Sequence, residues 1–226
     1  MDSKRVITYS RIGYAMNVMT AAIDSFVETA RGYAEKVDSN IADRENDFRS
    51  MCFWNIHNRA VMTREIVGFY MGALEKVDDD PVLRAEILER VVTVTRDMFV
   101  DTVSSIEKAS KDCLWAYRES SLKEKALNGG SHLYLRNIMT VSAEEGLMDE
   151  DESCDWDNIL LMRNLVTHNN SMGDRSKIFK VDGAGFSMRP NRMMKGGMCS
   201  FVVLTRRITE LFYLWLEAMD SRHAEV

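Results

Sequence analysis

The stretch from Asp155 to His168 reads DWDNILLMRNLVTH, and its apolar residues recur with the period of an α-helix. At about 100° per residue, they fill an arc from about 160° to 320° around the axis, counted from Arg163. The run NNSMG at residues 169–173 is rich in residues that end helices. The stretch therefore predicts an amphipathic helix at about residues 155–170, with one face for a core. The residues of that apolar face are Ile159, Leu161, Met162, Leu165 and Val166.

Three polar residues lie on the other side of this predicted helix: Arg163, Asn164 and His168. Relative to Arg163, Asn164 lies at about 100° and His168 at about 140°. An arginine can hold a phosphate, a histidine can transfer a proton near neutral pH, and an asparagine can orient either group. The set therefore favours cleavage of a phosphodiester. The same residues also fit a surface cation and a histidine that favours the negative end of the helix dipole.

The segment RNLVTHNN, at residues 163–170 in the second half of the chain, resembles the signature of the HEPN superfamily. The similarity covers roughly residues 155–217, which hold the motif helix, a glycine-containing insert and a long apolar helix. The resemblance implies an all-α fold and a metal-independent endoribonuclease whose active site is shared by two motif helices across a homodimer. It also implies a toxin or host-defence role, with an antitoxin or regulatory protein as a partner.

On this interpretation RNA is the substrate, and Arg163, Asn164 and His168 are the catalytic residues. His168 acts as acid or base, Arg163 stabilises charge on the phosphorane, and Asn164 orients the phosphate or the histidine. One histidine per chain is too few for two proton transfers, which is a physical reason to pair two helices. Glu65, on the second predicted helix, is a candidate acidic partner. Two alternatives remain open: a catalytically inactive HEPN-like module that binds a nucleotide, RNA or a protein, and a purely structural helical protein.

Helical periodicity and turn residues predict a single domain over residues 1–226, an all-α bundle of long antiparallel helices with a small β-hairpin before the last helix. An acidic loop is expected at residues 148–155. The insert at about 174–198 is expected to hold the hairpin, with strands at 177–181 and 185–188. Helices are expected at about residues 5–37, 48–77, 81–120, 131–146, 155–170 and 199–220.

The composition favours a cytoplasmic globular protein without a cofactor or a metal site. Apolar residues make up 46% and charged residues 28% of the chain, which is ordinary for such proteins. A net charge of −6 argues against a protein that coats nucleic acid, but it leaves room for a local basic site. No apolar run reaches the length of a membrane-spanning helix. The four widely spaced cysteines, expected to be reduced thiols, are Cys52, Cys113, Cys154 and Cys199.

The cations of the insert, Arg189, Arg192 and Lys195, are candidates for RNA contacts, and Arg206 and Arg207 continue the same basic stretch. Such cations can form a rim that binds phosphates. In a chain that is acidic as a whole, a solvated charged face is the favoured interpretation of this stretch.

The remaining histidines lie in no recognisable motif. His57 is interpreted as a partly buried or capping residue, His132 as part of the first turn of a helix, and His223 as part of a disordered C-terminal tail. Arg136 and Asn137 repeat the first half of the motif, but no histidine follows four to six residues later. This second pair is therefore interpreted as structural.

Overall fold

The computed structural model describes residues 3–41, 47–77, 80–168 and 172–224. These residues form seven α-helices and one two-stranded antiparallel sheet. The expected all-α bundle, with a small hairpin before the last helix, is confirmed. In chain order the elements are α1 (Ser3–Ser39), α2 (Phe48–Glu75), α3 (Pro81–Ala116), α4 (Ser120–Leu127), α5 (Leu135–Glu144), α6 (Glu150–His168), β1 (Lys177–Val181), β2 (Ala184–Met188) and α7 (Ser200–Ala224).

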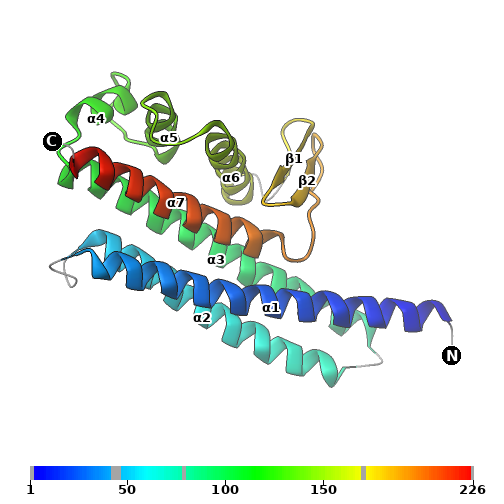
Figure 1. Ribbon diagram of the computed structural model, residues 1–226. Coiled ribbons are helices and arrows are strands. Elements are labelled where there is room, and N and C mark those ends of the chain that lie inside the picture. The colour runs from blue at the N-terminus through cyan, green and yellow to red at the C-terminus, as the bar shows by residue number, and fades with distance from the viewer. Residues whose placement is uncertain (1–2, 42–46, 78–79, 169–171, 225–226) are drawn as a thin grey trace.

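The four long helices α1, α2, α3 and α7 pack side by side and form the body of the molecule (Figure 1). α1, α3 and α7 run in one direction and α2 runs in the other. α7 is parallel to α3 because the segment from α4 to β2 carries the chain back along the outer side of α3 and α7 before α7 begins (Figure 1). In the described part of the chain, no helix combines the length and apolar character that crossing a membrane requires.

A cluster of aromatic residues from α2 and α7 connects the four-helix bundle to α5. Phe53 of α2 and Phe212 of α7 are fully buried and stack with their ring centroids 5.6 Å apart. Trp215 lies 5.9 Å from Phe212, and its indole N–H donates a hydrogen bond of 3.0 Å to the hydroxyl of Ser142 in α5. Buried aromatic rings contribute large apolar areas, and a buried indole N–H needs an acceptor. This cluster therefore fixes α5 against the bundle.

A charged network closes the end of the bundle where α2 begins. Asp47 is the N-cap of α2: its carboxylate accepts a hydrogen bond of 2.8 Å from the backbone N–H of Arg49 and pairs with the Arg49 guanidinium at 2.9 Å. The same guanidinium donates to the hydroxyl of Tyr117, at the end of α3, at 2.6 Å and to Asp220 in α7 at 3.1 Å. One arginine thus joins three of the four long helices.

Replacing Asp47 with alanine is expected to lower the free energy of unfolding by about 1–2 kcal/mol at pH 7, because the helix loses its cap. Burial raises the pKa of the Asp47 carboxyl, but hydrogen bonds from Arg49 outweigh burial and hold that pKa below its usual range. A carboxyl with a lowered folded-state pKa stabilises the fold above its unfolded pKa, and this contribution is lost as the pH falls below about 4. Urea unfolding at pH 7 and pH 3 should therefore show a smaller difference between wild type and variant at pH 3.

Asp47→Asn is the matched control, because asparagine caps a helix without titrating. The Asp47→Asn variant should keep most of the wild-type free energy of unfolding at pH 7. Between pH 7 and pH 3 its free energy of unfolding should fall less than that of the wild type. If Asp47→Ala lowers the free energy of unfolding by the same amount at pH 7 and at pH 3, the carboxylate charge does not contribute to stability.

The helices that follow α3 depart from the predicted boundaries. α3 ends at Ala116 rather than near residue 120, because Arg118 adopts a φ of 54°, which a right-handed helix does not allow. The short helix α4 was not predicted. α5 begins at Leu135 rather than near residue 131, so His132 precedes the helix and the prediction that it lies in the first turn is wrong.

The acidic segment expected to be a loop at residues 148–155 is mostly the first turns of α6. Asp149 accepts a hydrogen bond of 2.8 Å from the backbone N–H of Glu152, and Glu152 accepts one of 3.0 Å from the backbone N–H of Asp149. This reciprocal pair is a capping box, which starts a helix. Acidic residues in the first turn are also favoured by the helix dipole. The motif helix is therefore longer at its N-terminus than the apolar pattern indicates.

The predicted hairpin is confirmed. β1 and β2 pair from Lys177↔Met188 to Val181↔Ala184, leaving Asp182 and Gly183 as a two-residue turn. Both turn residues have positive φ angles, 45° and 76°, as the tight hairpin turns of Asp-Gly sequences require. β1 packs against α6 and α7, which places the hairpin beside the C-terminal half of the chain.

Candidate functional site

α6 is buried on two sides rather than on one. Ile159, Met162 and Leu165 belong to the core, as the apolar pattern predicts. Trp156 and Leu160, on the side assigned to polar groups, are also buried, with 2% and 6% of their surface exposed, and they line a pocket that α5 shares. A second apolar contact therefore covers part of the face on which the motif lies. What remains open to solvent is a narrow strip that runs along the helix from Asp151 through Asp157 to His168.

Arg163 lies at the edge of that strip and is tethered from two directions. One terminal nitrogen donates to the side-chain oxygen of Asn164 at 3.3 Å, and the other lies 3.7 Å from a carboxylate oxygen of Glu107 in α3. The buried Nε of Arg163 has no hydrogen-bond partner among the described residues. The other carboxylate oxygen of Glu107 is held more closely by Lys111, at 2.8 Å. Glu107 thus positions Arg163 without saturating its donors.

The acidic partner of the motif therefore comes from α3 and not from α2. α6 packs against α3, α5, α7 and β1, whereas Glu65 is exposed on α2. The suggestion that Glu65 partners the motif helix is wrong: Glu107 lies opposite Arg163 instead. The acidic residue nearest to Arg163 depends on which helix packs against α6, which the spacing of residues along one helix does not reveal.

A pocket of about 210 Å³ opens between α3, α5 and α6; it is called the α6 pocket below. Both Arg-Asn pairs of the sequence line it, so the pair interpreted as structural lies beside the motif pair. Arg136 forms an exposed ion pair of 3.3 Å with Asp157, and the Asn137 amide donates to the backbone of Ala126 at 3.1 Å. The lining residues are Val103, Glu107, Tyr134, Leu135, Arg136, Asn137, Leu160, Arg163 and Asn164.

His168 is the last residue of α6 and lies outside this pocket. Its side chain is exposed and makes no hydrogen bond or ion pair with any described residue. His168 and Asn164 are four residues apart, so their side chains are neighbours on one helix face, about 5–6 Å apart at Cβ. Arg163 is five residues from His168, which corresponds to about 7.5 Å along the axis and about 140° around it. The imidazole is thus accessible to a ligand from solvent. Residues 169–171, which follow it, lie outside the described part of the chain.

The predicted basic rim forms a loop attached to the chain that leaves α6. Arg189, Arg192 and Lys195 are exposed and form no ion pair within the described residues; residues 189–195 are called the basic loop below. The backbone N–H of Gly173 donates to the Arg192 carbonyl at 3.0 Å, and the backbone of Lys195 pairs with that of Ser187 in β2. A Cβ at position 173 would lie 2.6 Å from the Arg189 carbonyl oxygen, so glycine is required there.

The basic loop is therefore linked through Gly173 to the chain that follows the motif. Gly173 is five residues beyond His168, so their Cα atoms are at most about 18 Å apart. Two other cations of the same stretch do not extend the rim, because Arg206 pairs with Asp182, and Arg207 pairs with Asp155 at 2.7 Å.

The other histidines lie apart from the motif. The His57 ring packs edge-on against Trp54 at 5.4 Å, and its buried Nδ1 has no hydrogen-bond partner among the described residues. The prediction that His223 lies in a disordered tail is wrong: it occupies the last turn of α7, where its ring nitrogens lie 3.3 Å from Glu119 and 2.8 Å from the Met219 carbonyl. Helix formation thus continues beyond the predicted limit of residue 220.

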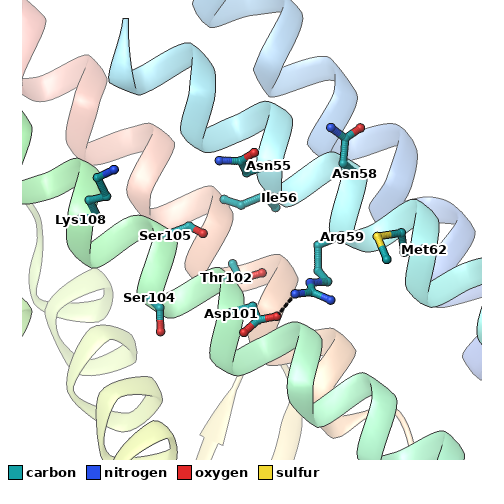
Figure 2. Close-up of a pocket in the computed structure, with 10 residues that line it drawn as sticks. All are labelled: Asn55, Ile56, Asn58, Arg59, Met62, Asp101, Thr102, Ser104, Ser105 and Lys108. Atoms are coloured by element: carbon teal, nitrogen blue, oxygen red, sulfur yellow. Dashed lines mark ion pairs between the residues drawn. The ribbon is translucent and has the colours of Figure 1, made fainter.

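A larger pocket of about 500 Å³ lies between α2 and α3 (Figure 2). Amides and hydroxyls line it together with Lys108 and with the ion pair of Arg59 and Asp101. The buried hydroxyl of Thr102 has no hydrogen-bond partner among the described residues. No motif residue and no histidine lines this pocket, so it offers polar contacts but no group that transfers protons near neutral pH. We therefore place the candidate site at the end of α6.

The described residues contain no cluster of three or more His, Cys, Asp or Glu side chains arranged to hold a metal ion. All four cysteines are free thiols, two of them buried. Comparisons of the chain with protein-family models, with curated proteins and with solved structures find no match.

Proposed function

We propose that this chain is a HEPN-like, metal-independent endoribonuclease that acts as a cytoplasmic homodimer. The observation that carries the proposal is the end of α6, where the exposed Asn164 and His168 lie one turn apart and the guanidinium of Arg163 donates to Asn164. Within the described chain, an exposed histidine ends this helix, and the chain that follows it is bonded at Gly173 to the basic loop. The four free thiols support a reducing compartment.

The groups present suit attack by the 2′-hydroxyl of RNA. The 2′-oxygen loses its proton to a base and forms a bond to phosphorus, while the bond from phosphorus to the 5′-oxygen breaks and an acid protonates the leaving oxygen. The product is a 2′,3′-cyclic phosphate. His168 supplies one proton-transfer group, Arg163 stabilises the charge that develops on the phosphorane, and Asn164 orients the phosphate.

The charges around Arg163 favour an anion. Lys111 and Arg163 share the single carboxylate of Glu107, which leaves one positive charge in excess. The basic loop adds three more exposed cations. The chain as a whole carries a net charge of −6, so attraction of RNA is confined to this region.

The direct test is incubation of the purified chain with a pool of single-stranded RNA in excess EDTA. Fragments are expected to accumulate, because the proposed groups need no metal ion. Fragments that appear only when Mg²⁺ is restored would contradict the proposal, and the same holds if intact RNA persists under every condition. A His168→Ala preparation, purified in the same way, controls for contaminating ribonucleases.

A homodimer is expected in solution, with the two motif helices close together. The reaction needs a base and an acid, and each chain presents one histidine at this site, so a second chain supplies the missing group. Sedimentation at micromolar concentration should give twice the 25.9 kDa mass of the chain. A monomer that cleaves RNA at the full rate would exclude a shared site.

A catalytically inactive binding module is the second candidate, and the position of His168 favours it. His168 lies outside the α6 pocket, so a phosphate can occupy that pocket without meeting the imidazole. RNA that binds but is never cut, by a protein shown to be dimeric, would support this module over the nuclease.

A further inference from the structure

We propose that the α6 pocket binds the nucleotide next to the scissile phosphate of single-stranded RNA, with Tyr134 stacking on its base and Arg136 contacting its phosphate. This inference rests on the proposed ribonuclease function and names the substrate class of that site. It assigns a role to α5, which the sequence motif does not include.

The N-terminal end of α5 forms one wall of the pocket. Tyr134 is the N-cap residue of α5, and no side chain caps the helix. The pocket is lined by Tyr134 and by the first three residues of the helix, Leu135, Arg136 and Asn137. Uncapped N–H groups and the positive end of the helix dipole favour a phosphate at such a place.

Two arginines reach the pocket from two different helices, α5 and α6. The Arg163 side chain keeps 26% of its surface exposed beside Glu107, and Arg136 is held only by an exposed ion pair with Asp157, of a kind that stabilises weakly. The charged residues that line the pocket are the cations Arg136 and Arg163 and the anion Glu107. The balance is one positive charge, which an entering phosphate would neutralise.

Tyr134 offers an aromatic surface on which the base of the nucleotide can stack. The Tyr134 side chain is one of the large exposed apolar groups of the molecule, with 57% of its surface accessible, and it lies at the rim of the pocket. A volume of about 210 Å³ is less than the about 300–1,000 Å³ of pockets that enclose a whole ligand. The pocket therefore holds the phosphate and ribose, and the base remains outside, on the phenol ring.

This arrangement selects unpaired RNA. Aromatic side chains stack on bases that have left a helix, and bases within a duplex are not available for such contacts. The scissile phosphate at the end of α6 and the nucleotide in the α6 pocket are then consecutive along one strand. A loop or a single-stranded region fits this path, whereas a base-paired duplex does not.

The test uses the whole 226-residue chain and a single-stranded oligonucleotide with 2′-O-methyl riboses, which cannot be cleaved by 2′-hydroxyl attack. Fluorescence anisotropy at low salt measures its dissociation constant. Tyr134→Ala should weaken binding by about 5- to 150-fold, the range for loss of one stacked base. Tyr134→Phe keeps the ring and should bind within about twofold of wild type. The same oligonucleotide annealed to its complement should bind at least about tenfold more weakly than the single strand.

Phe69→Ala is the matched control, because Phe69 is an exposed aromatic residue on α2, with 74% of its surface accessible, and it lies outside the pocket. Binding by Tyr134→Ala that equals wild type, or equal binding of duplex and single strand, overturns the pocket assignment, whether or not the protein cleaves RNA. Binding that depends on Tyr134 by a protein that never cuts RNA supports the pocket and overturns the nuclease instead.

Discussion

Replacing His168 with alanine is expected to reduce RNA cleavage by at least about a hundredfold, because a positioned acid or base contributes about 10²–10⁴ to the rate. The side chain is exposed and makes no hydrogen bond within the described residues, so its loss should leave the unfolding temperature unchanged. Initial rates on a fluorescent RNA, together with far-UV circular dichroism, measure both effects. Thr167→Ala is the neighbouring control, because the Thr167 hydroxyl bonds only within its own helix.

Replacing Arg163, the arginine of the motif, is expected to reduce RNA cleavage by a similar factor. Arg163→Ala removes a donor to the developing charge of the phosphorane, for which about 10²–10³ in rate is typical. Glu107 keeps Lys111 as its partner at 2.8 Å, so the fold should survive the substitution. Arg163→Lys retains the charge opposite Glu107 but not the planar fork that holds a phosphate, and it should remain stable with little activity. Cleavage at the wild-type rate by Arg163→Ala or by His168→Ala would remove the catalytic assignment.

The parts of the fold that the sequence predicts well are those fixed by local chemistry. Asp182 and Gly183 define a hairpin turn because few residues tolerate two consecutive positive φ angles. The helical period from Ile159 to Val166 locates the motif helix because an apolar face must be buried. The start of α6 was also encoded locally, in the capping box of Asp149 and Glu152, but a dense run of acidic residues resembles a loop when read by composition alone.

The parts of the site that could not be predicted depend on contacts between distant segments. Glu107 partners Arg163 only because α3 packs against α6, and nothing near Glu107 in the sequence indicates this. Arg136 and Tyr134 reach the site because the short helix α4 returns the chain along α3, and α4 was itself not predicted. The burial of Trp156 and Leu160 on the second side of α6 could not be predicted for the same reason, because the segment that covers them is α5. Periodicity identifies which face a helix buries but not which neighbour covers it.

A 2′-deoxy substitution at the scissile nucleotide is expected to block cleavage while leaving binding of the oligonucleotide largely intact. Without a metal ion that activates water, the available nucleophile is the 2′-hydroxyl of the substrate itself, and removing it leaves His168 with no proton to transfer. Phosphate contacts from Arg163 and the basic loop do not involve the sugar hydroxyl, so the dissociation constant should change by about twofold or less.

The chemical groups at the ends of the cleavage products test the same mechanism of 2′-hydroxyl attack. Attack by the 2′-hydroxyl retains the phosphate on the 3′ side, so mass spectrometry should find a 2′,3′-cyclic phosphate or a 3′-phosphate upstream of the cut and a 5′-hydroxyl downstream of it. Cleavage of the deoxy substrate, or a 5′-phosphate on the downstream fragment, would require water as the nucleophile. That outcome would leave Arg163 and the basic loop as binding groups but would remove the reason for pairing two copies of His168, because a site that activates water needs a different set of proton-transfer groups.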